Sequence, residues 1–461
     1  MKGMLIITAL GLFVMIAEIF KWRKVLLPAV LVGIAAAFAA NVMEWAAPLH
    51  ISYFDNMIFF DKAALAFSGV ILVTSFCWFI LANDYFEDSS NVVDHFALVL
   101  FTIAGALMLT AFTNMTTLFL GVEIMSIPLY VLAASRKTDL RSNEAGFKYL
   151  IMGSFASAFL LFGIALIYGA SGSFDLRTIQ AYVSAGNDLP LFFYAGVMFI
   201  LVSLCFKISA APFHFWAPDV YEGSPTLITA FMSTVVKTAA FAAIMRLFLM
   251  HLPHISIVWT GTLAVVIALS LIIANFTAAM QNSVKRMLAY SSISHAGFML
   301  MVILANVRSN ITIDAILYYS LAYSVSSIAA FGILYHVSRS GDESYEAFNG
   351  LGKRNPALAV CMTVAMLSLA GIPVTAGFFA KYMVFTTLIG SSYNWLLLLG
   401  VVTSAVSAYY YLKVIIAMYF RGTEHSSLKI ESAGSVVIIA ATVLTLVLGL
   451  APDLITGIFA F

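Results

Sequence analysis

The chain has 461 residues, of which 62% are hydrophobic and 10% are charged, and its formal net charge is +1. Soluble domains carry roughly a quarter of their residues as charged ones, so this composition predicts a polytopic membrane protein. The longest polar stretch, VSRSGDESYEAFNGLGKRNP, is too short to form a separate soluble domain. The net charge also gives no electrostatic basis for binding nucleic acid.

Apolar runs along the chain predict an all-α polytopic membrane protein with about fourteen transmembrane helices, because a helix needs about 20 apolar residues to cross a bilayer. The N-terminal run lacks a small-residue cleavage site, so we expect a retained first helix rather than a signal peptide. The predicted spans are residues 4–20, 25–46, 63–82, 96–113, 115–135, 147–170, 192–211, 226–249, 257–277, 283–304, 312–337, 357–388, 395–419 and 433–457.

Lysine and arginine are distributed unequally between the two sets of loops that join these spans. One set, which includes Arg136, Lys137 and the Lys285–Arg286 pair, holds most of the basic residues outside the spans. Cytoplasmic loops carry such an excess, so both termini are expected on the opposite, periplasmic side of a bacterial inner membrane. The Lys285–Arg286 pair is interpreted as a simple cytoplasmic anchor.

Four ionisable residues lie inside segments that are otherwise apolar: Glu123, Lys207, Lys237 and Lys381. A charged side chain at membrane depth costs about 2.5–3.5 kcal/mol on insertion scales, and such residues usually face a proton or ion pathway. A buried salt bridge with a purely structural role is the competing explanation for Glu123 and Lys207. For Lys381 the competing explanation is a side chain that reaches the membrane surface.

Two of the spans contain helix breakers next to a lysine. Lys207 precedes Pro212 in KISAAPFHFWAPDV, and Lys381 follows Pro373 in LAGIPVTAGFFAKY. Paired interrupted spans are typical of inverted-repeat transporters, although two ordinary proline kinks would give the same pattern. We therefore predict two inverted five-helix repeats, spans 4–8 and 9–13, each with a broken helix. The predicted segments are an N-terminal part at 1–95, repeats at 96–250 and 257–419, and a C-terminal helix at 433–461.

The stretch KISAAPFHFWAPDVYEGSPTLITAFMSTVVKTAAF resembles the signature of the antiporter-like membrane subunits of respiratory complex I, a superfamily that includes Mrp-type cation/proton antiporters. NSVKRMLAYSSISHAGFML and LAGIPVTAGFFAKYMVF agree with it, and DVYEGSPT is similar to the N-subunit branch. The resemblance implies proton translocation coupled to electron transfer from NADH to quinone. It also implies partnership with other complex I membrane subunits, including antiporter-like paralogues.

The resemblance carries over residue by residue. Glu123 matches the fifth-helix glutamate, and Lys207, Lys237 and Lys381 match the lysines of the seventh, eighth and twelfth helices. His295 stands where several paralogues have lysine, and a hydrogen-bonded core histidine is an equally good interpretation. Together these five residues are the predicted proton relay.

The chemistry of this set suits proton transfer, because a carrier must exist in two protonation states. Burial disfavours the charged form of a lysine and a nearby carboxylate favours it, so Lys207 and Glu123 are predicted to form a tunable pair. The three isolated cysteines and the absence of a Rossmann glycine fingerprint predict no cofactor in this chain. NADH, FMN, iron–sulfur clusters and quinone are expected in partner subunits. The alternatives are a subunit of an Mrp-type antiporter and a scaffold that no longer conducts.

Overall fold

The fold comes from a computed structural model that describes residues 1–20, 22–46, 52–83, 85, 92–185, 189–305, 310–422 and 432–456. Nearly all of these residues are helical, which confirms the predicted all-α fold. The two named β-strands among the described residues, β1 (Ser52–Tyr53) and β2 (Ile58–Phe59), form one short antiparallel hairpin in the connection before the third predicted span.

The helices follow the predicted order of spans. In the first part of the chain they are α1 (Lys2–Ile19), α2 (Arg23–Ala46), α3 (Lys62–Leu81), α5 (Val92–Ala111), α6 (Met115–Ala133), α7 (Leu140–Ser171), α8 (Leu176–Ser184), α9 (Leu191–Lys207), α10 (Trp216–Gly223), α11 (Thr226–Phe231) and α12 (Lys237–Ile244). In the second part they are α13 (Ser256–Ala279), α14 (Val284–Leu304), α15 (Asn310–Val337), α16 (Leu351–Arg354), α17 (Pro356–Ala370), α18 (Ala376–Leu388), α19 (Asn394–Phe420) and α20 (Ser432–Leu450).

Tighter and wider helical turns complete this list. Two π-helical stretches, Met232–Val236 and Met245–His251, lie on either side of α12. Short 3₁₀ turns lie at Pro253–Ile255, Ser338–Ser340, Glu346–Phe348 and Pro452–Leu454.

Within the described residues, eleven helices are long and apolar enough to cross a membrane. Three shorter apolar helices, Lys2–Ala17, Leu191–Lys207 and Pro356–Ala370, lie where the first, seventh and twelfth spans are expected. The membrane-spanning class of fold is thereby confirmed, while the exact count of fourteen and the inverted repeat remain predictions.

Polar side chains fix where several helices begin. Asn114, Asp139 and Asp175 precede α6, α7 and α8, and each side chain accepts a hydrogen bond from a backbone N–H of the first turn. Such caps satisfy N–H groups that have no partner inside the helix. The cap at Asp139 explains why α7 begins before residue 147, the predicted start of that span.

Both predicted helix breaks are present. The helix α9 ends at Lys207, earlier than the predicted end at residue 211, because Ser209 has a left-handed backbone (φ 59°) and Pro212 cannot donate a hydrogen bond. In the second case α17 ends at Ala370, where Gly371 (φ 85°) forms the C-cap, and α18 begins at Ala376. Each break therefore replaces a continuous span with two helical pieces.

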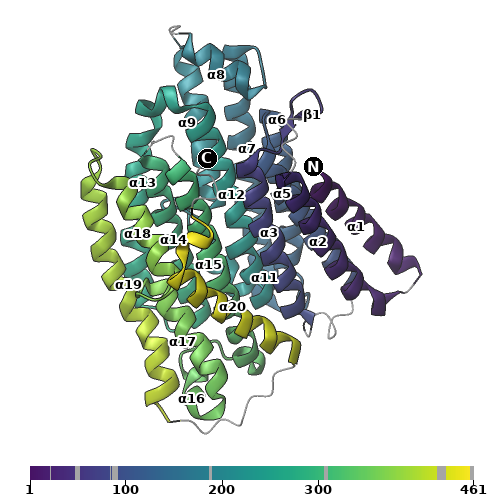
Figure 1. Ribbon diagram of the computed structural model, residues 1–461, viewed down its shortest axis with the longest axis vertical. Coiled ribbons are helices and arrows are strands. Elements are labelled where there is room, and N and C mark those ends of the chain that lie inside the picture. The colour runs from purple at the N-terminus through teal and green to yellow at the C-terminus, as the bar shows by residue number, and fades with distance from the viewer. Residues whose placement is uncertain are drawn as a thin grey trace. The chain divides into compact units, whose positions relative to one another are not determined.

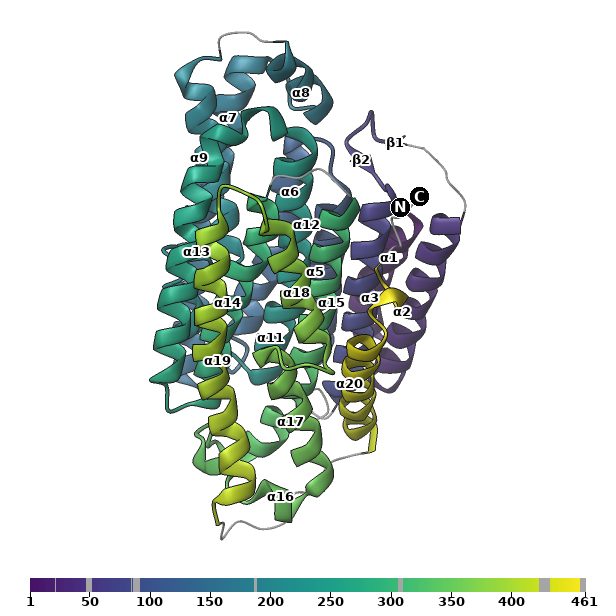
Figure 2. The same ribbon diagram turned by 60° about the vertical axis from the view of Figure 1, so that its left-hand side comes forward.

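The chain divides into two compact units. The first contains Met1–Phe79, Tyr85–Ser209 and Val235–Leu263, and the second contains Ile80–Asp84, Ala210–Thr234 and Ala264–Phe461. In the first unit α1 packs against both α2 and α5, as the purple and blue ribbons show (Figure 1). In the second unit α15 packs against α14, α17, α18 and α20 (Figure 2).

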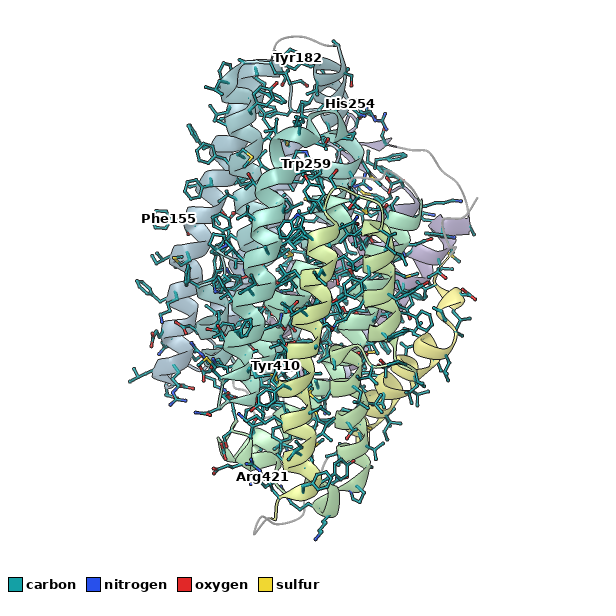
Figure 3. The ribbon with its side chains drawn as sticks, turned by 90° about the vertical axis from the view of Figure 1, so that its left-hand side faces the viewer. Phe155, Tyr182, His254, Trp259, Tyr410 and Arg421 are labelled. Atoms are coloured by element: carbon teal, nitrogen blue, oxygen red, sulfur yellow. The ribbon has the colours of Figure 1, made fainter. Side chains whose placement is uncertain are left out.

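Large apolar side chains cover the outward faces of several helices. Phe155 on α7 is 64% exposed and projects away from its helix, whereas Tyr410 on α19 is fully buried (Figure 3). Soluble proteins rarely expose contiguous apolar surfaces of this kind. The exposed faces of α7 and α19 are therefore surfaces for lipid or for neighbouring membrane subunits.

Candidate functional site

Glu123 lies on α6 and is partly buried. Ser157 of α7 donates a hydrogen bond to its Oε1 atom. A carboxylate at membrane depth needs hydrogen-bond donors or a cation nearby, because burial without them is costly. The α6–α7 contact supplies one such donor to Glu123.

Lys207 is the last residue of α9, and its side chain is buried. Its Nζ atom donates a hydrogen bond to the Ser126 hydroxyl, which in turn donates to the carbonyl of Val122 on α6. Nζ also lies 5.7 Å from the centre of the Tyr149 ring. A hydroxyl and an aromatic face thus surround the ammonium group.

The predicted pair of Glu123 and Lys207 is brought to the same face of α6. Glu123 and Ser126 are three residues apart, so their side chains are neighbours on the helix surface. Among the described residues, no ion pair within 4.0 Å joins Lys207 to Glu123. Lys207 Nζ therefore reaches α6 at Ser126, one helical turn from Glu123.

Lys237 is the first residue of α12 and only 1% exposed. The helix packs against α5 and α9, and a π-helical stretch precedes Lys237 directly. Single π-helical turns inside α-helices occur frequently at functional sites. The amino-acid sequence alone gives no sign of this distortion.

His295 lies on α14 within a group of tyrosines. Its Nδ1 atom is 2.7 Å from the Tyr319 hydroxyl and its Nε2 atom is 3.2 Å from the Tyr411 hydroxyl. The Tyr323 ring lies 4.9 Å from the imidazole ring, measured between centres. Both ring nitrogens therefore have hydroxyl partners, which satisfies a buried histidine and also offers it two routes for proton exchange.

Lys381 lies on α18 and is 5% exposed. Its Nζ atom donates hydrogen bonds of 2.7 Å to the carbonyl of Ala370 and to the Ser404 hydroxyl. The same atom lies 5.0 Å from the centre of the Phe298 ring. Ala370 ends α17, so the ammonium group lies at the negative end of that helix dipole. This burial argues against a lysine that reaches the membrane surface.

The two compact units each hold part of the predicted relay. Glu123, Lys207 and Lys237 belong to the first unit, and His295 and Lys381 belong to the second. Sequence reasoning missed the hydroxyl groups that contact these residues, namely Ser126, Ser157, Tyr319, Tyr411 and Ser404. Two hydroxyl-rich runs in apolar spans could have indicated three of them: YYSLAYSVSS at residues 318–327 contains Tyr319, and SAVSAYYY at residues 404–411 contains Ser404 and Tyr411.

Lys285 and Arg286 differ from the expected simple anchor. Lys285 is 1% exposed, and its Nζ atom binds Glu343 Oε1 at 2.9 Å and the Ser224 carbonyl at 2.8 Å. Arg286 forms ion pairs with Asp219 and Glu222. They differ because acidic residues from other segments pair with them. The loop of residues 341–350 supplies Glu343 to Lys285, and α10 supplies both acidic partners of Arg286. The buried Lys285 and the partly exposed Arg286 therefore fasten α10 to α14.

Within the part of the chain that the structure describes, no group of three or more His, Cys, Asp or Glu side chains could hold a metal ion.

Residues 112–407 match the family described as NADH:quinone oxidoreductase/Mrp antiporter, TM. The chain therefore belongs to this family of membrane proteins. Its curated relatives include the NADH-quinone oxidoreductase subunit N of Flavobacterium psychrophilum, 40% identical over 459 residues, and that of Cytophaga hutchinsonii, 42% identical over 465 residues. Each comparison covers 99% of this chain and 99% of the relative.

Solved structures agree with this assignment. A chain of respiratory complex I from Thermus thermophilus with bound Aureothin is 33% identical, with a TM-score of 0.84 and 98% of both chains covered. A chain of the archaeal membrane-bound sulfane sulfur reductase is 26% identical, with a TM-score of 0.89 and coverage of 100% of this chain and 96% of that one. A chain of the Mrp complex from Dietzia has a TM-score of 0.83 at 20% identity, covering 98% of this chain and 94% of that one, and shares the fold.

Proposed function

We propose that the protein is the N-type membrane subunit of a proton-translocating NADH–quinone oxidoreductase in a bacterial inner membrane. The observation that carries this proposal is the near full-length similarity, at 40% and 42% identity, to two subunits of that name. The alternative, a subunit of an Mrp-type antiporter, has weaker support because the likeness to the Mrp chain lies at 20% identity. Both termini are placed on the periplasmic side by the lysine and arginine bias.

Protons move, in this proposal, along Glu123, Lys207 and Lys237 in the first unit and along His295 and Lys381 in the second. All except Glu123 are at most 6% exposed, and the two helix breaks lie next to Lys207 and Lys381. Irregular backbone at membrane depth is tolerated where it is buried in protein or lines a cavity. Buried ionisable groups at such breaks are what a proton path requires.

Ser126 brings the ammonium group of Lys207 to the part of α6 that carries Glu123. While Lys207 is protonated, its ammonium group donates to Ser126, which is three residues from Glu123. A change in the position or charge of Glu123 would alter how strongly Lys207 holds its proton.

The free energy for transport must come from partner subunits. Moving one charge against a membrane potential costs about 2.3 kcal/mol per 100 mV, and a relay only lowers barriers. We propose that NADH, FMN, iron–sulfur clusters and quinone are bound by the other subunits of the complex, while this chain contributes the proton path. Other antiporter-like membrane subunits are its expected neighbours.

Purification from native membranes in a mild detergent tests this proposal. An affinity tag on this chain should recover NADH-oxidising and quinone-binding subunits together with antiporter-like chains. A preparation from cells that express the untagged chain is the control for nonspecific recovery. Recovery of antiporter-like chains alone, without any NADH dehydrogenase activity, would favour the Mrp-type alternative instead.

A further inference from the structure

A small cavity lies in the second unit beside His295. It has a volume of about 10 Å³, and the residues that line it include His295, Tyr319, Tyr323, Ser326, Ser368 and Ala380. About 10–15 Å³ of such space is needed for one water molecule, which also needs two to four polar partners. The tyrosine and serine hydroxyls on the wall supply those partners, while the Nδ1 atom of His295 faces the Tyr319 hydroxyl.

Two serines on this wall are already hydrogen-bonded to each other. The Ser326 hydroxyl on α15 donates to the Ser368 hydroxyl on α17 at 2.8 Å. Ser368 also accepts a hydrogen bond of 3.1 Å from the backbone N–H of Gly377 on α18. The pair therefore connects α15, which carries the tyrosines around His295, to the helix that carries Lys381.

Gly377 lets α18, the helix that carries Lys381, pack against α17. Lys381 Nζ donates to the carbonyl of Ala370, two residues after Ser368 on α17. A Cβ atom added at Gly377 would lie 1.8 Å from the carbonyl oxygen of Ser368, so only glycine allows α18 to approach α17 this closely. Lys381 is four residues further along α18 and projects from the same face. Ala380, its neighbour, lines the cavity.

We propose that this cavity holds one water molecule, and that this water and the Ser326–Ser368 hydroxyl pair carry protons between His295 and Lys381. This inference rests on the proposed proton-translocating function. A protonated His295 gives its Nδ1 proton to the Tyr319 hydroxyl, which passes its own proton to the water. The water passes a proton to Ser326, Ser326 passes one to Ser368, and Ser368 passes one to the neutral Lys381 amine. At each oxygen one O–H bond breaks as another forms, so neither the tyrosine, the serines nor the water changes its net charge.

Substitutions at Ser326 by two residues of similar shape, threonine and valine, test whether the hydroxyl group is needed. Threonine and valine have nearly the same shape and differ by the hydroxyl group. In the whole complex reconstituted into liposomes, Ser326→Thr should retain proton pumping per NADH oxidised. In the Ser326→Val variant, proton pumping per NADH oxidised should fall by about ten-fold or more, because a proton-transfer partner is lost. Equal pumping by the two variants would overturn the proposal.

Ser320 supplies the matched control position. It is a buried serine on the same helix, 3.8 Å from the Met299 sulfur, and it does not line the cavity. The Thr and Val variants at Ser320 should pump alike. If the larger side chains at 326 prevent assembly, Ser326→Ala replaces them, because it adds no atom. Reduced pumping by Ser326→Ala then supports the proposal, and undiminished pumping overturns it.

A further variant separates failure of this inference from failure of the proposed function. Lys381→Arg keeps the positive charge but holds its proton throughout the working pH range. Normal pumping by Ser326→Val together with lost pumping by Lys381→Arg would overturn the serine–water step alone. Normal pumping by both would overturn the relay as well.

Discussion

Lys207 donates a hydrogen bond to the hydroxyl of Ser126, one helical turn beyond Glu123 on α6. The lysine that sequence reasoning pairs with Glu123 therefore contacts α6 through the Ser126 hydroxyl. This arrangement stabilises the ammonium form of Lys207 while leaving the Glu123 carboxylate free to accept from Ser157.

Ser126→Ala tests that relationship. A hydrogen bond to a charged group contributes about 1.5–3 kcal/mol, and a change of about 1.4 kcal/mol alters a rate about ten-fold. We expect proton pumping per NADH oxidised to fall by about ten-fold or more, with assembly intact. Ser75 is the control, because its hydroxyl is buried and has no hydrogen-bond partner among the residues that the structure describes. Ser75→Ala should pump normally, and a Ser126→Ala variant that does the same would contradict this role.

Glu123→Gln removes a charge and preserves the shape of the side chain. The amide can still accept from Ser157, so the α6–α7 contact should survive and the complex should assemble. Pumping should fall markedly, because the electrostatic influence on Lys207 is lost. Glu144 provides the comparison, since its side chain is 63% exposed in a pair with Lys148. Similar small effects at both positions would indicate a structural role for Glu123.

Lys285→Ala should destabilise the protein. Breaking a buried ion pair lowers the free energy of unfolding by about 3–5 kcal/mol, because the remaining charge is left without a partner. Glu343 is partly exposed to solvent, so we expect a loss near the lower end of this range. The midpoint of thermal unfolding in detergent should fall measurably. Lys148→Ala removes an exposed pair, which contributes about 0–1 kcal/mol, and should change little. Equal midpoints for the two variants would argue against the fastening of α10 to α14.

Gly377→Ala should prevent normal assembly. The added Cβ would overlap the carbonyl oxygen of Ser368, a backbone atom that cannot move without displacing α17. Gly261→Ala is the matched control, because no atom lies within 4 Å of a Cβ built there. The amount of complex in the membrane and its NADH oxidation rate provide the measurement. Wild-type amounts of the Gly377→Ala complex, with a normal NADH oxidation rate, would show that α17 and α18 can move apart without loss of assembly or activity.

Sequence patterns gave the membrane class, the order of helices and both helix breaks. Each depends on local composition: long apolar runs form the spans, and Pro212 and Gly371 interrupt two of them. The positions of Lys207 and Lys237 in apolar runs likewise favoured burial, whereas for Lys381 the sequence left open a side chain that reaches the membrane surface, and the structure shows it buried.

Contacts between distant segments could not be predicted in the same way. Ser126 is an unremarkable small residue in an apolar helix, and its role depends on where α9 ends. The partners of His295 lie on α15 and α19, and one sequence does not reveal which helices pack against α14. Lys285 matched the pattern of a surface anchor, yet the distant Glu343 makes it a buried ion pair.

The proton-carrying role of Lys207 is the central claim, and Lys207→Arg tests it most directly. Arginine keeps the positive charge next to Ser126 and Glu123 but cannot release its proton in the working pH range. The decisive measurement is proton pumping per NADH oxidised by the assembled complex in liposomes, with exposed Lys148→Arg as the control. The account predicts that Lys207→Arg assembles and loses most of its pumping, while Lys148→Arg retains it. Full pumping by Lys207→Arg would show that position 207 provides a fixed charge and would contradict the relay.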